Sequence, residues 1–227
     1  MKFNIYTEAL PSNKIGNEVL EIVGANLTGL SLLSVPPSNL FHAIYTWTLQ
    51  TEIGSYMGRI GQISGEPHHL IVAMDNESDE VVGFLLYSPV PSDTEACGIN
   101  YMAVKHTHRS RGIGSKMMRM VIERFPHVDL TCTVKMVSFY ESLGFQIIGR
   151  HVTQVNMNTR SYATKGLMAV LDVDQILRGP EVQSMNEQLI QRWGRRAVKD
   201  ATKSLERHKD QLTRRTEAFV RSHIGAL

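Results

Sequence analysis

The segment from Val104 to Ser115 constrains the fold more than any other part of the chain. It joins the end of an apolar strand to the run Arg109-Ser110-Arg111-Gly112-Ile113-Gly114-Ser115. Downstream, apolar residues recur every three or four positions, which predicts a helix that begins near Gly112 or Ile113. They are Ile113, Met117, Met118, Val121, Ile122 and Phe125. A strand, a glycine-rich bend and a helix are therefore expected in this order.

The start of this helix suits an anion. N–H groups in the first turn have no partner inside the helix, and the helix dipole is positive at this end. Gly112 and Gly114 let the backbone approach a pyrophosphate, while Arg109 and Arg111 add positive charge. The spacing fits neither a P-loop nor the three-glycine dinucleotide fingerprint. Two interpretations stay open here, a phosphate site of another kind and a basic surface turn.

This run resembles motif A of the GNAT superfamily, the Gcn5-related N-acetyltransferases. The pattern of that motif is Arg or Gln, two residues, Gly, one residue, and Gly or Ala, and Arg109, Gly112 and Gly114 fill it. The segment Ser138-Phe139-Tyr140-Glu141-Ser142-Leu143-Gly144-Phe145 is similar to the family's second signature. The resemblance covers roughly residues 2–171. It implies an α/β fold of three layers, αβα, around a central mixed sheet, with acetyl-CoA as co-substrate.

The order of elements along the chain is compatible with this fold. Apolar alternation and β-branched runs predict strands at residues 2–7, 70–74, 81–87, 96–104, 128–134, 145–150 and 161–171. Helical spacing predicts helices that start near Ser12 and Ser38, and two more at 114–125 and 135–143. The helix at 114–125 connects two strands that are expected to be parallel, because a crossover joins them.

The resemblance also implies where acetyl-CoA would bind. Its pyrophosphate would lie on the backbone N–H groups of Arg109, Ser110, Arg111, Gly112, Ile113, Gly114 and Ser115. The pantetheine arm would run along Met102, Ala103 and Val104, where the family's strand separates from its neighbour. Thr133 occupies a position at which many relatives have an asparagine that contacts CoA.

Acetyl transfer to an amine needs a base and an acid. A lysine-like amine has an unperturbed pKa of about 10.4 and must lose a proton before it attacks. The resemblance assigns Tyr140 as the acid that protonates the leaving thiolate, and a backbone N–H of Ala103 or Met102 would stabilise the oxyanion. Many relatives have a glutamate where this chain has Gly98. Glu95, three residues earlier, is the predicted base.

The C-terminal part has a different character. We expect an acetyltransferase domain at 1–172 and a basic helical extension at 173–227. From Arg178 onward there are eleven Lys or Arg residues against six Asp or Glu residues. A narrow apolar stripe recurs at helical spacing, formed by Met185, Leu189, Trp193, Ala197, Ala201, Leu205, Leu212 and Phe219.

Three interpretations of this extension are open. The helix could lie back across the sheet, pair with a second copy or another protein through residues 180–223, or place its basic face on nucleic acid. A partner helix is favoured over nucleic acid, since interleaved aromatic residues and a nucleic-acid motif are missing from the sequence.

Composition narrows the remaining classes. No apolar run reaches the length of a membrane span, and the first residues lack the order of a signal peptide, so a cytoplasmic location is expected. Cys97 and Cys132 are too few for a disulfide framework and fall in predicted strands, which favours buried free thiols. The histidines do not stand at zinc-ligand spacing, and no metal is predicted.

Two functions follow from these expectations. The first is an N-acetyltransferase that moves the acetyl group of acetyl-CoA to a primary amine of a protein, peptide or small molecule. The alternative is a GNAT-fold module of weak or absent activity that docks into a larger assembly through its C-terminal helix.

Overall fold

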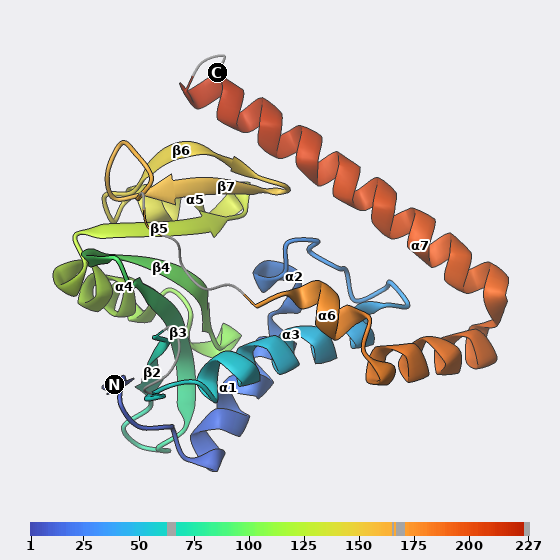
Figure 1. Cartoon of the computed structure of the whole chain (residues 1–227), viewed down its shortest axis with the longest axis horizontal. Helices are drawn as coiled ribbons and strands as arrows, with labels where there is room; N and C mark the ends of the chain where they lie inside the picture. Colours follow the sequence, from blue (N-terminus) through green and yellow to red (C-terminus); the bar gives the residue numbers. More distant parts are fainter. Residues whose placement is uncertain (63–66, 165, 167–170, 225–227) are drawn as a thin grey trace.

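A computed structural model describes residues 1–62, 67–164, 166 and 171–224. Within them, a seven-stranded sheet forms the centre of the molecule, with the strand order β1-β2-β3-β4-β5-β7-β6 (Figure 1). The strands are β1 (Lys2–Tyr6), β2 (His69–Met74), β3 (Val81–Val90), β4 (Asp93–Val104), β5 (His127–Cys132), β6 (Gln146–His151) and β7 (Gln154–Asn158). Only the pairing of β4 with β5 is parallel within this sheet, as the crossover predicted.

Helices cover both faces of the sheet. On one face lie α1 (Asn13–Ala25), α2 (Leu27–Leu30) and α3 (His42–Met57), and the hydroxyl of Ser12 caps α1 by accepting from the N–H of Ile15. On the other lie α4 (Ile113–Arg124) and α5 (Val137–Glu141), which the 3-10 turns η1 (His106–His108) and η2 (Val134–Met136) precede. Each face buries its own apolar cluster, and each fully buried aliphatic side chain contributes about 1.5–3 kcal/mol. The predicted three-layer arrangement is confirmed.

The two parallel strands separate soon after they meet. Their register contains three pairs, from Ala96 opposite His127 to Gly98 opposite Asp129. Beyond these pairs β4 continues to Val104 and β5 to Cys132. The separation that the resemblance implied is therefore present.

A β-bulge sits in β4 where this separation begins. Tyr101 pairs with Leu86 and Ile99 with Tyr87, so Asn100 is the extra residue. Leu86 and Tyr101 belong to the apolar cluster beneath α1 and α3, whereas Tyr87 and Ile99 belong to the cluster beneath α4. A bulge directs successive side chains to one face and sharpens the local twist.

One predicted strand is wrong. The last strand was expected at 161–171, but the strand is β7, which pairs with both β5 and β6. A two-residue turn at Val152 and Thr153, with Val152 at φ 51, makes β6 and β7 a hairpin. Residues 161–164 carry no strand, and residues 165 and 167–170 of the expected strand lie outside the described residues.

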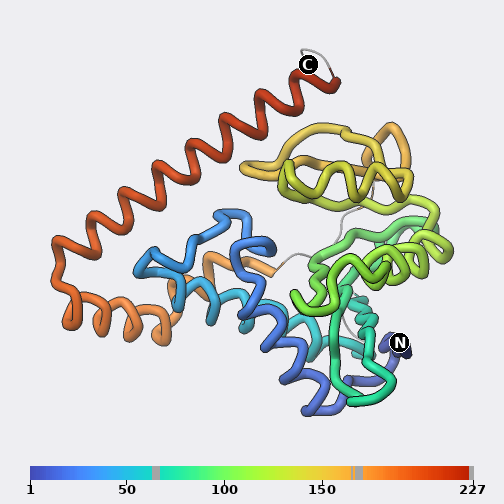
Figure 2. The backbone as a smooth tube through the Cα atoms, turned by 180° about the vertical axis from the view of Figure 1, so that it is seen from behind, coloured from blue at the N-terminus to red at the C-terminus, as the bar shows by residue number. Residues whose placement is uncertain are grey.

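The C-terminal extension is helical, as expected. α6 (Val173–Leu177) is followed by α7 (Pro180–Ile224), which contains a kink at Gly194 with φ 80 and ψ 153. Beyond the kink α7 runs diagonally back to the β6–β7 hairpin (Figures 1 and 2). Among the described helices, none is both long and apolar enough to cross a bilayer.

The second half of α7 packs on its own chain. Val220 is buried in the cluster beneath α4, and Leu205 joins the cluster beneath α3. The hydroxyl of Thr216 donates to the carbonyl oxygen of Thr153 at 2.7 Å, and the Asn39 amide donates to the carbonyl oxygen of Ala201 at 3.2 Å. This part of the apolar stripe is therefore not free to pair with another chain, whereas Trp193, near the kink, stays 51% exposed.

Candidate functional site

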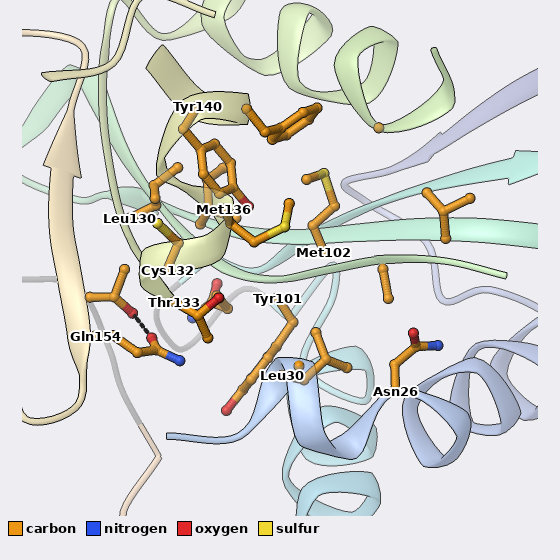
Figure 3. A pocket seen from close by; sticks show the side chains of 18 of the residues that line it. Asn26, Leu30, Tyr101, Met102, Leu130, Cys132, Thr133, Met136, Tyr140 and Gln154 are labelled. Carbon is orange, nitrogen blue, oxygen red and sulfur yellow. Dashed lines mark hydrogen bonds between the residues drawn. The ribbon is translucent and has the colours of Figure 1, made fainter. Parts of the chain in front are cut away.

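A cavity of about 990 Å³ opens where β4 and β5 diverge. One wall comes from the loop before α4, another from α2 and α3, and a third from β5, α5 and the β6–β7 hairpin (Figure 3). Eleven of the predicted site residues line this cavity: Met102, Ala103, Val104, Arg109, Ser110, Gly112, Ile113, Gly114, Ser115, Thr133 and Tyr140. The predicted site residues Arg111 and Glu95 do not line it.

The loop before α4 has the backbone of an anion site. Ser110 and Gly112 have φ of 59 and 75, and α4 begins directly after Gly112. Residues of positive φ in a bend can turn neighbouring N–H groups toward one point. A Cβ on Gly114 would meet the Phe139 ring at 3.6 Å and the Met102 side chain at 3.8 Å, which is ordinary contact. Packing of the chain itself therefore does not require a glycine at 114, and the space there is available to a ligand.

Arg109 is held toward the same loop. Its Nε donates to the carbonyl oxygen of Val104 at 3.2 Å, and its guanidinium also donates to the side-chain oxygen of Asn26 at the end of α1. Both partners line the cavity, so these bonds fix a positive charge beside the helix start. Arg111 is exposed on the outer side of the bend.

The backbone of β4 decides which amide faces the gap. The N–H of Lys105 donates to the carbonyl oxygen of Val82 at 2.7 Å. Hydrogen-bonded and non-bonded pairs alternate along an antiparallel ladder. Ala103 therefore directs its backbone groups to β3, and Met102 directs them to the gap between β4 and β5. Of the two predicted oxyanion donors, only Met102 has its N–H on the side of the cavity.

Tyr140 lies deep in the wall formed by α5. Its ring meets Phe139 and Phe145 edge to face, with centroids 5.0 and 5.7 Å apart. Burial raises the pKa of its hydroxyl, and the nearby Cys132 adds to the effect. Figure 3 shows the ring beside Met136 among the side chains of the cavity. The phenol is therefore protonated at neutral pH and able to donate.

Glu95 is not placed to act as the base. It lies near the start of β4, where the strand is still closing on β5, so it stands beyond the closed end of the gap. Its side chain is 68% exposed and forms an ion pair with Arg160 at 3.6 Å. The solvated position at the strand start does not favour Glu95 as the base.

A different carboxyl group reaches the cavity. Glu52 of α3 is 4% exposed, and its Oε1 accepts from the Tyr101 hydroxyl at 2.8 Å. Burial raises the pKa of Glu52 to about 7, against a smaller lowering by the Tyr101 hydrogen bond. Both residues line the cavity. The sequence did contain a signal, because Glu52 falls at helical spacing among Leu49, Ile53 and Tyr56, on the buried side of α3.

The geometry defines a class of protein. The loop at residues 109–115, called the anion loop below, and the separated strands β4 and β5 flank a cavity that contains the buried carboxyl group of Glu52 and the buried phenol of Tyr140. Residues 66–147 match the acetyltransferase (GNAT) domain family. The match identifies a GNAT-type domain in this part of the chain.

Solved structures of the same fold are distant in sequence. An acyl-CoA N-acyltransferase from Pseudomonas aeruginosa is similar at a TM-score of 0.50 and 11% identity, over 70% of this chain and 99% of that one. A protein from Pyrococcus horikoshii OT3 has a TM-score of 0.48 and 15% identity, over 70% and 98%. Tetrahymena GCN5 has a TM-score of 0.46 and 13% identity, over 72% and 99%. No curated protein matches the sequence.

Proposed function

We propose that the protein is an N-acetyltransferase that moves the acetyl group of acetyl-CoA to a primary amine. The observation that carries this proposal is the buried carboxyl group of Glu52, which lies in the same cavity as the anion loop and Tyr140. Arg109 and the amides from Ser110 to Ser115 would bind the pyrophosphate. Thr133 and the β4 residues Met102 to Val104 would border the pantetheine arm.

Glu52 is the proposed base. A carboxyl group with a pKa of about 7 is half ionised near neutral pH, and a base acts best when its pKa lies close to the working pH. The hydrogen bond from Tyr101 occupies Oε1, while Oε2 has no hydrogen-bond partner among the described residues. Oε2 is therefore available to take a proton from the ammonium form of the acceptor, directly or through one water.

The remaining steps use Met102 and Tyr140. The amine nitrogen attacks the thioester carbon and forms the new N–C bond, while the carbonyl oxygen gains negative charge that the Met102 N–H stabilises. The C–S bond then breaks, and the Tyr140 hydroxyl gives its proton to the leaving thiolate. The nitrogen loses its second proton to solvent, directly or through Glu52 once that carboxyl group has released the first proton to water.

The test is CoA release with a panel of primary amines, for the wild type and for Tyr140→Phe and Glu52→Gln. We expect release by the wild type and a loss of at least about 100-fold in kcat for either variant. Glu95→Gln is the matched control and should keep full activity. If the wild type binds acetyl-CoA and releases no CoA with any amine, the alternative of an inactive module that docks through its C-terminal helix is supported instead.

We further infer the boundary of the catalytic unit and its location. All lining residues of the cavity fall between Asn26 and Ala163, and α6 and α7 follow them in the chain, which supports a division into 1–172 and 173–227. Cys97 and Cys132 are free and buried, which is compatible with a reducing cytoplasm. The exposed turns of α7 around Trp193 could take a protein partner or a second copy.

A further inference from the structure

A chain of three buried or half-buried polar side chains leads from the core to the cavity. The ring Nδ1 of His68 lies 2.7 Å from the hydroxyl of Ser88, and that hydroxyl donates to Oδ1 of Asn100 at 2.7 Å. His68 and Ser88 are fully buried, and Asn100 lines the cavity. The proposed mechanism uses none of the three residues.

The donor and acceptor in each of these hydrogen bonds can be assigned from the unpaired ring nitrogen of His68. Nε2 of His68 is buried and has no partner among the described residues. Burial lowers the pKa of His68 to about 4, so the ring is neutral and has one N–H. An unpaired buried N–H is rarer than an unpaired acceptor. The N–H therefore sits on Nδ1 and donates to Ser88, and Ser88 donates to Asn100.

This assignment fixes the orientation of the Asn100 side-chain amide. Its oxygen is engaged by Ser88, so its Nδ2 is the group left for the cavity, and Nδ2 has no protein acceptor within the described part of the chain. Nδ2 is pre-organised as a donor, because the hydrogen bonds from His68 to Ser88 and from Ser88 to Oδ1 hold the amide in one orientation. An amide nitrogen in this position can only donate.

The β-bulge decides which part of the cavity this donor faces. Asn100 bonds to Ser88 and Tyr101 packs under α3, so both side chains point to the α3 face of the sheet. Tyr101 holds Glu52 on that same face. Met102 points to the opposite cluster. The Asn100 donor therefore lies on the acceptor side with the proposed base, and apart from the amide of Met102 that serves the thioester.

We propose that Nδ2 of Asn100 binds a carbonyl oxygen next to the reacting amine, so that the preferred acceptor is an α-amine followed by a neutral amide carbonyl, as at the start of a peptide. This inference rests on the proposed acetyl transfer. A simple alkylamine has no carbonyl oxygen that could accept a hydrogen bond from Nδ2. A free amino acid would place its carboxylate near the carboxylate of Glu52, and the two like charges repel each other.

The test compares two acceptors of similar size, alanine amide and isobutylamine. The ratio of kcat/KM for alanine amide over isobutylamine should be about 10-fold higher in the wild type than in Asn100→Leu, the worth of one hydrogen bond, and comparing the two ratios cancels the different basicity of the amines. Asn100→Leu should lower this ratio by slowing alanine amide alone. Ser88→Ala, which frees the Asn100 amide to turn, should raise the KM for alanine amide with little change in kcat. Asn156→Leu, which removes another amide from the cavity wall, should keep the preference.

Several outcomes overturn the proposal. An Asn100→Leu variant that keeps the wild-type ratio of the two amines would do so. If that variant slows both amines alike, the donor acts on the thioester instead. CoA affinity and the melting temperature of each variant separate these results from misfolding.

If no amine is acetylated, the proposed acetyl transfer fails while the subsite can still be tested. Calorimetry on the CoA-loaded protein should then detect alanine amide, with weaker binding of isobutylamine and of alanine amide to Asn100→Leu. Equal binding of both amines would contradict the proposed Asn100 subsite.

Discussion

Replacing Glu52 by Gln should inactivate the protein and stabilise it at the same time. Glutamine keeps the size of the side chain and an oxygen that accepts from Tyr101, but it removes the ionisable group. In the folded protein the pKa of Glu52 is raised from 4.5 to about 7 because the side chain is buried. Ionisation of the wild type therefore costs folding free energy that the variant does not lose.

The magnitude and the pH window follow from the pKa values. The folded pKa lies above the unfolded one, so the wild type has its full stability below pH 4.5 and loses stability as the pH rises toward 7. A shift of about 2.5 units corresponds to roughly 3 kcal/mol once both states are ionised. Glu52→Gln should match the wild type near pH 4 and exceed it by roughly 3 kcal/mol at pH 8, or roughly 6 to 12 °C in Tm.

The assay is urea unfolding at several pH values between 4 and 8, alongside kcat/KM for an amine. In the wild type, kcat/KM should rise with pH through about 7 as Glu52 ionises. Glu95→Gln, whose side chain is exposed, should change neither quantity. A stability difference that does not grow with pH would refute the raised pKa, and a fully active Glu52→Gln would refute the assignment of the base.

Three further predictions concern the loop before α4 and the packing of α7. Gly114→Val should weaken CoA binding more than 10-fold in calorimetry with little change in Tm, because the added atoms enter the cavity where the chain leaves room. Gly112→Ala should cost about 1 kcal/mol in urea unfolding, because φ is 75 there; an unchanged stability would contradict this. Val220→Ala should cost about 2 kcal/mol, whereas Ile190→Ala at an exposed position of α7 should cost almost nothing; equal losses would mean that α7 does not pack as described.

The anion loop could be predicted from the sequence because its signals are local. Gly112, Gly114 and the apolar spacing after them fix a bend and a helix start within a dozen residues. The strands up to β6 were likewise marked by apolar alternation and turns. β7 was missed because only Val155 and Met157 of its five residues are apolar, and its polar residues Gln154, Asn156 and Asn158 are typical of a connecting segment.

The proposed base, Glu52, could not be found by following the strand that carries a glutamate in many relatives. Glu52 lies 49 residues before Tyr101, and only the packing of α3 on β4 brings the two together. The same holds for Asn100, whose role depends on a bulge that no residue pattern in β4 marks. Contacts between distant segments set these positions, and local spacing does not encode them.

The return of α7 joins two segments that also meet through the Thr153 hydroxyl, which donates to the carbonyl oxygen of Leu32. Residues 201–208 hold the segment that contains Ser34 and Asn39, and Thr216 holds Thr153 at the tip of the β6–β7 hairpin. These segments flank opposite sides of the cavity mouth, near Leu32 and Gln154. A molecule bound between these segments would reduce local opening where α7 is attached to each of them. Amide hydrogen exchange in α7 should therefore become slower, although α7 does not line the cavity.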